Sequence, residues 1–308
     1  MGSRSGAAPE YLAIAGPTAT GKSAVALALA ERLGGEIVIA DSRQVYRGID
    51  VASAKPTMAE RARVRHHLVE VVDLGARYSA ADYAAAAAIA IDAIRARGGV
   101  AIVCGGTGLY FAALAGRLDR IEEDAGETDR AAARARIDAI PIRERHAALA
   151  RVDREAAARL PAADRQRVER ALEVWFLTGR PLSALQSGGG EPRPHLAVRL
   201  TRPRPELHRR IDERLDAMLA AGLEREAREL WEAGWSADAP GLDTIGVQEW
   251  WPCFAGTRGR EETIAGIRAA TRRYAKRQST WFRHQGEYRP VPADDAVASV
   301  HELWSRAG

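Results

Sequence analysis

The stretch Gly16-Pro17-Thr18-Ala19-Thr20-Gly21-Lys22-Ser23 fills every fixed position of the phosphate-binding pattern G-x-x-x-x-G-K-[ST]. The apolar run 11–15 before it predicts a buried strand, and the Ala/Leu-rich run 23–33 after it predicts a helix that stops at Gly34-Gly35. The pattern needs this strand–loop–helix context, because backbone N–H groups and the helix N-terminus together surround the phosphates. We therefore expect a ligand with two or more phosphates here, with Ser23 as a ligand for Mg²⁺.

Lysine usage strengthens this interpretation. Only three of the 45 basic residues are lysines, namely Lys22, Lys55 and Lys276, and the others are arginines. Lysine acts in the loop as a compact point charge between phosphates, a geometry that the planar guanidinium group does not reproduce. A chance match on an ordinary strand–turn–helix is therefore the weaker interpretation.

Composition sets broad limits. With 308 residues, 46 % hydrophobic and 28 % charged, the chain is long enough for one large or two smaller globular domains. No apolar stretch reaches membrane-spanning length, and the polar N-terminus lacks the apolar core of a signal sequence. The two cysteines, Cys104 and Cys253, offer neither a disulfide framework nor metal-ligand spacing, so a cytoplasmic location is expected. A net charge of +4 does not by itself indicate a nucleic-acid partner.

The first third of the chain alternates between strands and helices. Residues 36–40 and 100–104 predict two more strands, and residues 79–97 predict a helix with Ser79 as its N-cap. This alternation favours an α/β fold with a parallel sheet flanked by helices. Because functional loops follow the carboxyl ends of parallel strands, three segments are expected at one crevice: the phosphate loop, Asp41 with its neighbours, and the turn 105–108.

The middle of the chain differs in character. Residues 119–190 contain no convincing strand, whereas residues 195–200 predict a strand that returns to the sheet. We therefore expect a helical insertion domain at 119–190, between the two parts of the α/β core at 1–118 and 191–308.

Basic residues concentrate in segment 263–286, which has no acidic residue. A spacing of four places Arg268, Arg272 and Lys276 on one helix face, with aromatic residues nearby. Such a face suits an RNA backbone and unstacked bases, although an ordinary solvated helix has the same pattern. Arg165, Arg167 and Arg170 form a second, weaker basic cluster in the insertion.

Six motifs in order resemble those of the bacterial tRNA dimethylallyltransferases, also called tRNA isopentenyltransferases or the IPP transferase family. The resemblance extends from residue 13 to about residue 283, and all three lysines fall inside the motifs. The motifs are 16–23 (GPTATGKS), 41–46 (DSRQVY), 54–56 (AKP), 105–110 (GGTGLY), 164–173 (DRQRVERALE) and 275–282 (AKRQSTWF).

The resemblance implies a P-loop NTPase-like fold and a prenyl transfer. The dimethylallyl group would move from its diphosphate to the N6 amine of the adenosine 3′-adjacent to the anticodon of a tRNA, with Mg²⁺ as cofactor. It gives Asp41 the role of general base, although Asp41 could instead bind magnesium through water. Thr107 would help to place the substrates and Arg214 would bind the diphosphate, although the same residues also suit a turn and a helix surface. The tRNA contacts that it implies are Asp41, Ser42, Arg43, Gln44, Arg134, Gln166, Arg167, Arg170, Lys276, Arg277 and Gln278.

One departure concerns an expected RNA contact. Relatives carry Gly-Tyr followed by a basic residue where this chain has Gly246-Val247-Gln248-Glu249. Two other functions stay open: a P-loop kinase or ATPase, which the loop alone would fit, and prenylation of a free adenine nucleotide. The long insertion and the basic segment favour a macromolecular acceptor, and we expect a monomer with no membrane association.

Overall fold

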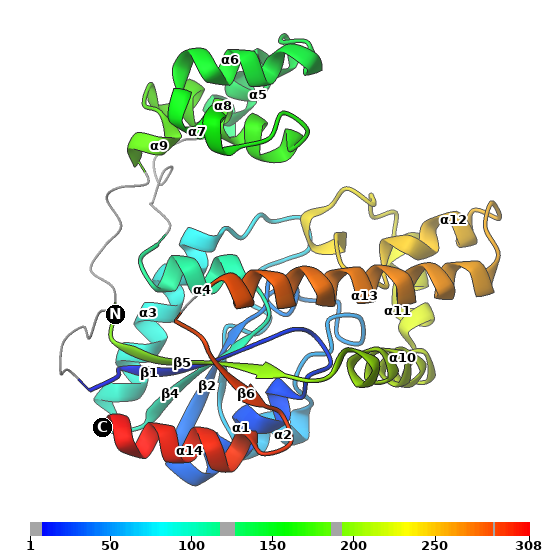
Figure 1. The fold of residues 1–308 in the computed structure, drawn as a ribbon. Coiled ribbons are helices and arrows are strands. Elements are labelled where there is room, and N and C mark those ends of the chain that lie inside the picture. Colours follow the sequence, from blue (N-terminus) through cyan, green and yellow to red (C-terminus); the bar gives the residue numbers. More distant parts are fainter. Residues whose placement is uncertain (1–7, 118–126, 186–192, 286) are drawn as a thin grey trace. The chain divides into compact units, whose positions relative to one another are not determined.

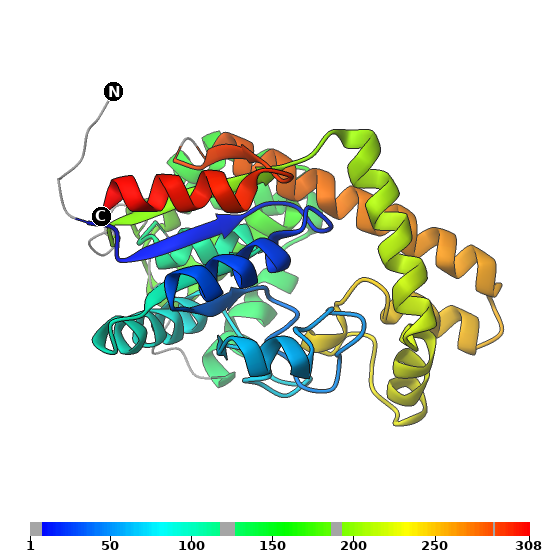
Figure 2. The same cartoon turned by 90° about the horizontal axis from the view of Figure 1, so that it is seen from below.

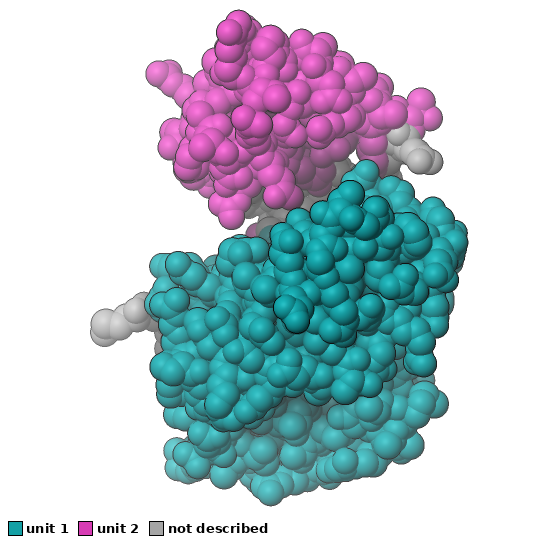
Figure 3. Space-filling view, turned by 90° about the vertical axis from the view of Figure 1, so that its right-hand side faces the viewer, with its two compact units in different colours: residues 1–114, 193–308 teal, residues 115–192 magenta. Residues whose placement is uncertain are grey.

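The computed structural model describes residues 8–117, 127–185, 193–285 and 287–308. The chain divides into two compact units, residues 1–114 with 193–308 and residues 115–192, which Figure 3 colours separately. The boundaries expected from the sequence, 118/119 and 190/191, lie outside the described residues.

The first unit is built on a parallel sheet of six strands in the order β3-β2-β4-β1-β5-β6 (Figure 1). The strand that feeds the phosphate loop, β1, is central: Ile14 pairs with Cys104 of β4 on one side and with Val198 of β5 on the other. The predicted α/β parallel sheet is confirmed. The strands are β1 (Tyr11–Ala15), β2 (Gly35–Ala40), β3 (His66–His67), β4 (Val100–Gly105), β5 (His195–Thr201) and β6 (Arg289–Pro292).

Helices cover both faces of this sheet because its strands are apolar on both sides. In β1, Leu12 and Ile14 pack with α1 (Lys22–Leu33) and α14 (Ala296–Ala307). Alternate residues such as Tyr11 and Ala13 belong to a second core with α3 (Ala80–Ala96) and α4 (Gly108–Leu114). A near-continuous apolar run is typical of a strand buried on both faces.

Local signals set the ends of the first helices. Helix α1 begins after Gly21, whose φ is +97°, and ends at Gly34, whose φ is +61°; L side chains rarely adopt either conformation. Ser79 caps α3 by accepting a hydrogen bond from the Asp82 N–H, and the Asp82 carboxylate accepts one from the Ser79 N–H. The N-cap predicted at Ser79 is confirmed.

Two edge strands were not predicted. Strand β3 has only two residues, and its His67 contacts the Glu36 carboxylate. Strand β6 contains Pro290 and Pro292, which pair with Arg199 and Thr201 of β5. Proline cannot donate a hydrogen bond to a neighbouring strand, so such a strand is tolerated at the edge of a sheet but is hard to recognise from sequence.

The remaining helices of this unit include a long pair that extends beyond the sheet, α10 and α13 (Figures 1 and 2). Arg272 of α13 contacts Asp212 of α10 at 2.5 Å, from Nη2 to Oδ2. The helices are α2 (Met58–Arg63), α10 (Arg204–Ala220), α11 (Leu223–Glu232), α12 (Trp251–Phe254) and α13 (Arg260–His284), with 3-10 turns η2 (Pro240–Leu242) and η3 (Gln248–Trp250).

The second unit is helical and has a core of its own. Ile137, Leu149, Val168 and Leu172 are almost completely buried in it. Among its described residues there is no strand, as the sequence predicted. Its elements are α5 (Glu127–Asp138), η1 (Ile142–Glu144), α6 (Arg145–Val152), α7 (Arg154–Arg159), α8 (Arg165–Thr178) and α9 (Leu182–Leu185).

Candidate functional site

The carboxyl ends of three neighbouring strands lie together in the first unit. Gly105 of β4 pairs with Ala15 of β1 and with Ala40 of β2, so the phosphate loop, Asp41 and the turn 105–108 follow strands that end at the same level. A Cβ at Gly105 would lie 2.0 Å from the Ala40 carbonyl oxygen, which explains the glycine at this position. The expected meeting of the three segments is therefore found.

The phosphate loop is held by contacts within its own backbone. Thr20 Oγ1 donates to the Pro17 carbonyl at 2.8 Å, and Lys22 Nζ donates to the same oxygen at 2.7 Å. The latter contact keeps the ammonium group over the loop. The backbone N–H groups of Ala19, Gly21, Lys22 and Ser23 have no partner in the described part of the chain, so they can surround a phosphate.

Two cations and one carboxylate share an electrostatic environment beside this loop. Burial lowers the pKa of Lys22 to about 8, Asp41 acts against this shift, and Arg214 adds to it. Burial also lowers the pKa of the Arg214 guanidinium, and Asp41 again opposes the shift. Arg214 has no hydrogen bond or ion pair with any described residue. Its positive charge is therefore available to an anion at the loop.

Asp41 and Thr107 are fixed by backbone contacts. Asp41 Oδ1 accepts a hydrogen bond from the Arg43 N–H at 2.9 Å, which leaves Oδ2 without a partner in the described chain. Thr107 Oγ1 accepts one from the Ser42 N–H at 2.9 Å. These two contacts hold the chain after β2 against the turn after β4.

Tyr274 of α13 belongs to this site, although the sequence indicated it only as an aromatic residue beside the basic residues of segment 263–286. Burial, with Asp41 as the next largest influence, raises the pKa of Tyr274 to about 12, and the nearby Thr107 acts against this shift. Tyr274 precedes Gln278 by four residues, so the two share one face of α13. Neither this spacing nor the aromatic character of the segment indicates from sequence that Tyr274 lies near Asp41.

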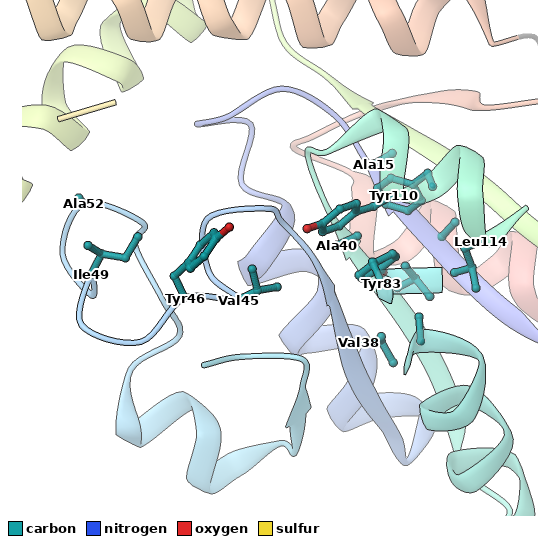
Figure 4. Packing of buried hydrophobic residues seen from close by; sticks show 14 of the residues in the cluster. Ala15, Val38, Ala40, Val45, Tyr46, Ile49, Ala52, Tyr83, Tyr110 and Leu114 are labelled. Carbon is teal, nitrogen blue, oxygen red and sulfur yellow. The ribbon is translucent and has the colours of Figure 1, made fainter. Parts of the chain in front are cut away.

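A tyrosine cluster packs beside Asp41. Figure 4 shows the hydroxyl groups of Tyr46 and Tyr110 pointing toward each other. The ring of Tyr110 stacks on that of Tyr83, with ring centroids 4.1 Å apart. Burial raises the pKa of Tyr110, and Asp41 acts in the same direction. The segment that follows β2 and the helix that follows the turn 105–108 therefore meet through aromatic side chains.

The chain after Asp41 is anchored to neighbouring loops. Gln44 is buried, and its Nε2 donates to the carbonyls of Ser53 and Ala54 at 3.1 and 3.0 Å. Arg43 Nη1 donates to the Pro240 carbonyl at 3.1 Å. Lys55 is also buried and forms an ion pair with Asp50, so its role is structural.

The helix face expected at Arg268, Arg272 and Lys276 is found on α13, but two of its three basic residues form ion pairs. Arg268 and Arg272 form ion pairs with Asp212 of α10, and Arg268 also pairs with Asp216. These acidic partners come from a helix far away in sequence, so segment 263–286 alone could not reveal them. Lys276 and Arg277 are exposed, and the Arg277 guanidinium lies 5.5 Å from the centre of the Tyr274 ring.

Gln278, also predicted to contact tRNA, is only 6 % exposed. Its Oε1 accepts a hydrogen bond from the Thr18 N–H and its Nε2 donates to the Gly106 carbonyl, both at 2.9 Å.

In the second unit, Gln166, Arg167 and Arg170 are exposed on α8. Arg170 Nη1 donates to Glu173 Oε2 at 2.8 Å. Arg134 contacts Glu169 at 3.2 Å and Asp138 at 3.4 Å, so its charge is already balanced within the unit.

The sequence predicts Ser23 as a Mg²⁺ ligand and no stretch of membrane-spanning length. Among the described residues, no group of three or more histidine, cysteine or acidic side chains could hold a metal ion. Ser23 is exposed in the first turn of α1, next to Lys22. No helix in the described ranges is long and apolar enough to cross a membrane.

The departure at 246–249 is accommodated locally. Val247 is completely buried and packs in the main core. Glu249 Oε2 accepts a hydrogen bond from the Gly246 N–H at 2.8 Å. Burial raises the pKa of Glu249.

Known proteins are similar to this chain over most of its length. A tRNA dimethylallyltransferase of Halorhodospira halophila is 46 % identical over 94 % of this chain and 95 % of its own. A solved tRNA isopentenylpyrophosphate transferase of Bacillus halodurans is 34 % identical with a TM-score of 0.72, covering 97 % of this chain and 96 % of that one. A eukaryotic dimethylallyltransferase solved acting on tRNA is 25 % identical with a TM-score of 0.79, covering 95 % and 77 %. A family model described as IPP transferase matches residues 44–285, and the chain belongs to the IPP transferase family.

Proposed function

We propose that this protein transfers the dimethylallyl group from dimethylallyl diphosphate to the N6 amine of the adenosine 3′-adjacent to the anticodon in tRNA. The carbon–oxygen bond to the diphosphate breaks, the new bond to N6 forms, and diphosphate leaves with the electron pair. The N6 proton passes to a base. Membership of the IPP transferase family, with relatives named tRNA dimethylallyltransferase, supports this reaction.

The observation that carries the proposal is that Asp41 follows β2 at the level where β1 leads into the phosphate loop, so that its charge acts on both Lys22 and Arg214. The chemistry needs a positive region for the leaving diphosphate and, next to it, a group that accepts a proton from a weakly nucleophilic amine. Lys22, Arg214 and the free loop amides supply the first, and the carboxylate of Asp41 supplies the second. These groups come from the loop after β1 with the start of α1, from the end of β2 and from α10.

Charge stabilisation is the main contribution of the phosphate loop. As the carbon–oxygen bond breaks, negative charge grows on the diphosphate oxygens. Donors already aimed at that position stabilise the transition state more than the ground state. Thr107, which accepts a hydrogen bond from the residue after Asp41, and Tyr274, whose pKa Asp41 raises, position the acceptor side of the site.

Magnesium fits the residues at the loop. Mg²⁺ prefers oxygen ligands and usually keeps several waters while it binds substrate phosphates through one or two protein groups. The exposed hydroxyl of Ser23 supplies one such group beside Lys22. When bound, the ion neutralises diphosphate charge, and no larger acidic cluster is needed for that role.

Both units supply candidate RNA contacts. In the second unit these are the exposed Gln166, Arg167 and Arg170 of α8, with Arg134 nearby in an ion pair. In the first unit they are Lys276 and Arg277 of α13 and the segment of Asp41, Ser42 and Arg43, whereas the side chain of Gln44 is buried and its Nε2 donates to two backbone carbonyls. An anticodon-loop base must leave its stack to reach a carboxylate in a crevice. The protein acts as a cytoplasmic monomer in this proposal.

A comparison of acceptors tests the function. Radiolabelled dimethylallyl diphosphate is incubated with Mg²⁺ and either unmodified tRNA or AMP, and ATP hydrolysis is followed in parallel. Label in tRNA alone is expected. Label in AMP alone would favour a nucleotide prenyltransferase. Hydrolysis of ATP without label transfer would favour a P-loop kinase or ATPase.

A further inference from the structure

One side chain joins the phosphate loop to the turn after β4. The primary amide of Gln278 accepts from the backbone N–H of Thr18 and donates to the backbone carbonyl of Gly106, each at 2.9 Å. The two loops are separated by almost ninety residues in sequence, and Gln278 reaches them from a third element, α13. Gln278 is buried, its hydrogen bond to Gly106 is buried and its hydrogen bond to Thr18 is partly buried, so water has little access to either.

A glutamine suits this position for a chemical reason. The side chain must accept from one backbone group and donate to another, and a primary amide does both. A carboxylate could accept from Thr18 but could not donate to Gly106. An ammonium group could donate but could not accept. Leaving either buried backbone group without a partner carries a free-energy cost.

Two glycines allow α13 to lie close to the turn. A Cβ at Gly106 would lie 2.3 Å from Gln278 Nε2, and a Cβ at Gly108 would lie 2.4 Å from Cδ2 of Trp281. Gln278 and Trp281 are three residues apart on one helix face. The helix is therefore packed against the turn at two points.

The contact with Gln278 also determines which backbone N–H groups of the phosphate loop remain available to bind a ligand. The Thr18 N–H is taken by Gln278, whereas those of Ala19, Gly21, Lys22 and Ser23 have no partner in the described ranges. A side chain that holds the loop at Thr18 therefore fixes the direction of the groups that follow. Donors that are fixed before binding lose less entropy when they bind an anion.

We propose that Gln278 is a positioning residue of the diphosphate site and not a contact to tRNA. The identity of the diphosphate ligand rests on the proposed function. The adjacent residues Lys276 and Arg277 are exposed, whereas Gln278 is buried. Neighbouring residues of α13 therefore have different roles. The exposed Lys276 and Arg277 bind RNA, and the buried Gln278 holds the phosphate loop.

The test compares binding of the two ligands in matched variants. Gln278→Met keeps the length of the side chain and removes both hydrogen bonds, and Lys276→Ala is the control on the same turn. Binding of dimethylallyl diphosphate with Mg²⁺ is measured by calorimetry, and binding of unmodified tRNA is measured by filter retention. Gln278→Met is expected to weaken diphosphate binding about tenfold, with tRNA affinity within about twofold of the parent. Lys276→Ala is expected to show the opposite pattern.

Steady-state kinetics give a second readout. Gln278→Met is expected to raise the KM for dimethylallyl diphosphate and to leave the KM for tRNA unchanged. Weakened tRNA binding with unchanged diphosphate affinity would overturn the proposal. An equal loss of affinity for both ligands, or unchanged affinity for both, would also overturn it. Gln278→Glu, which keeps the acceptor for Thr18, provides a folded alternative if the methionine variant unfolds. Because the binding assays involve no transfer, they decide the role of Gln278 even if the parent protein prenylates no tRNA.

Discussion

The hydroxyl of Thr107 accepts a hydrogen bond from the backbone N–H of Ser42 at 2.9 Å. This contact joins the turn after β4 to the residue that follows Asp41. Tyr274 of α13 lies near the same hydroxyl. Thr107 thus holds the segment of Asp41 against the turn after β4, and its contribution to catalysis comes through that carboxylate and through the substrates beside it.

Replacing Thr107 tests this link. Thr107→Val keeps the shape but leaves the Ser42 N–H without its acceptor, at a cost of about 1–3 kcal/mol. We expect a lower kcat and a small loss of thermal stability. Thr107→Ser, which keeps the hydroxyl, is the control and is expected to retain most activity. Equal impairment of the two variants in steady-state assays would show that the methyl group, and not the hydrogen bond, matters.

Asp41→Asn tests the general base. The amide can still accept from the Arg43 N–H through its oxygen, so the local turn is expected to persist. It cannot take up the N6 proton, and kcat is expected to fall by roughly 10²–10⁴. Affinity for tRNA is expected to stay within about twofold. A comparable loss of tRNA affinity, measured by filter retention, would argue against the assignment.

The pH dependence of diphosphate binding tests Lys22. Burial lowers the pKa of Lys22 to about 8 from its ordinary 10.5. Only the protonated form attracts the diphosphate, so affinity is expected to fall as the pH rises through about 8. Below that pH the lysine is charged and the affinity is expected to level off. In Lys22→Ala, calorimetry is expected to show weaker binding without this step; an unchanged step in the variant would assign it to another group.

Lys276 and Arg277 are predicted to be RNA contacts, in contrast to Arg272. The double variant Lys276→Ala/Arg277→Ala is expected to bind tRNA more weakly and to flatten the slope of log K against log salt by roughly 0.7 per lost phosphate contact. Arg272 forms an ion pair with Asp212, so Arg272→Ala is the matched control. It is expected to lower stability and to leave the salt slope unchanged. A flattened slope in Arg272→Ala alone would reverse the two assignments.

Much of the core could be predicted because its signals are local. The apolar strand 11–15, the loop 16–23 and the cap at Ser79 each depend on neighbours in sequence, and all are found. Strand β6 was missed because its prolines argue against a strand, and only its position at the edge permits them.

The site was harder to predict where partners are distant in sequence. The ion pairs of Arg268 and Arg272 depend on acidic residues of α10, and the contacts of Gln278 depend on two loops far from α13. No spacing within segment 263–286 contains that information. The concentration of basic residues therefore located the segment, while the partners of each side chain came from the fold.

The most direct measurement compares two tRNAs that differ at one position. Radiolabelled dimethylallyl diphosphate is offered to an unmodified tRNA with adenosine 3′-adjacent to the anticodon and to the same tRNA with guanosine there. The account predicts label in the first tRNA, recovered as an N6-substituted adenosine after digestion, and none in the second. Equal labelling of both tRNAs, or label in neither, would contradict it.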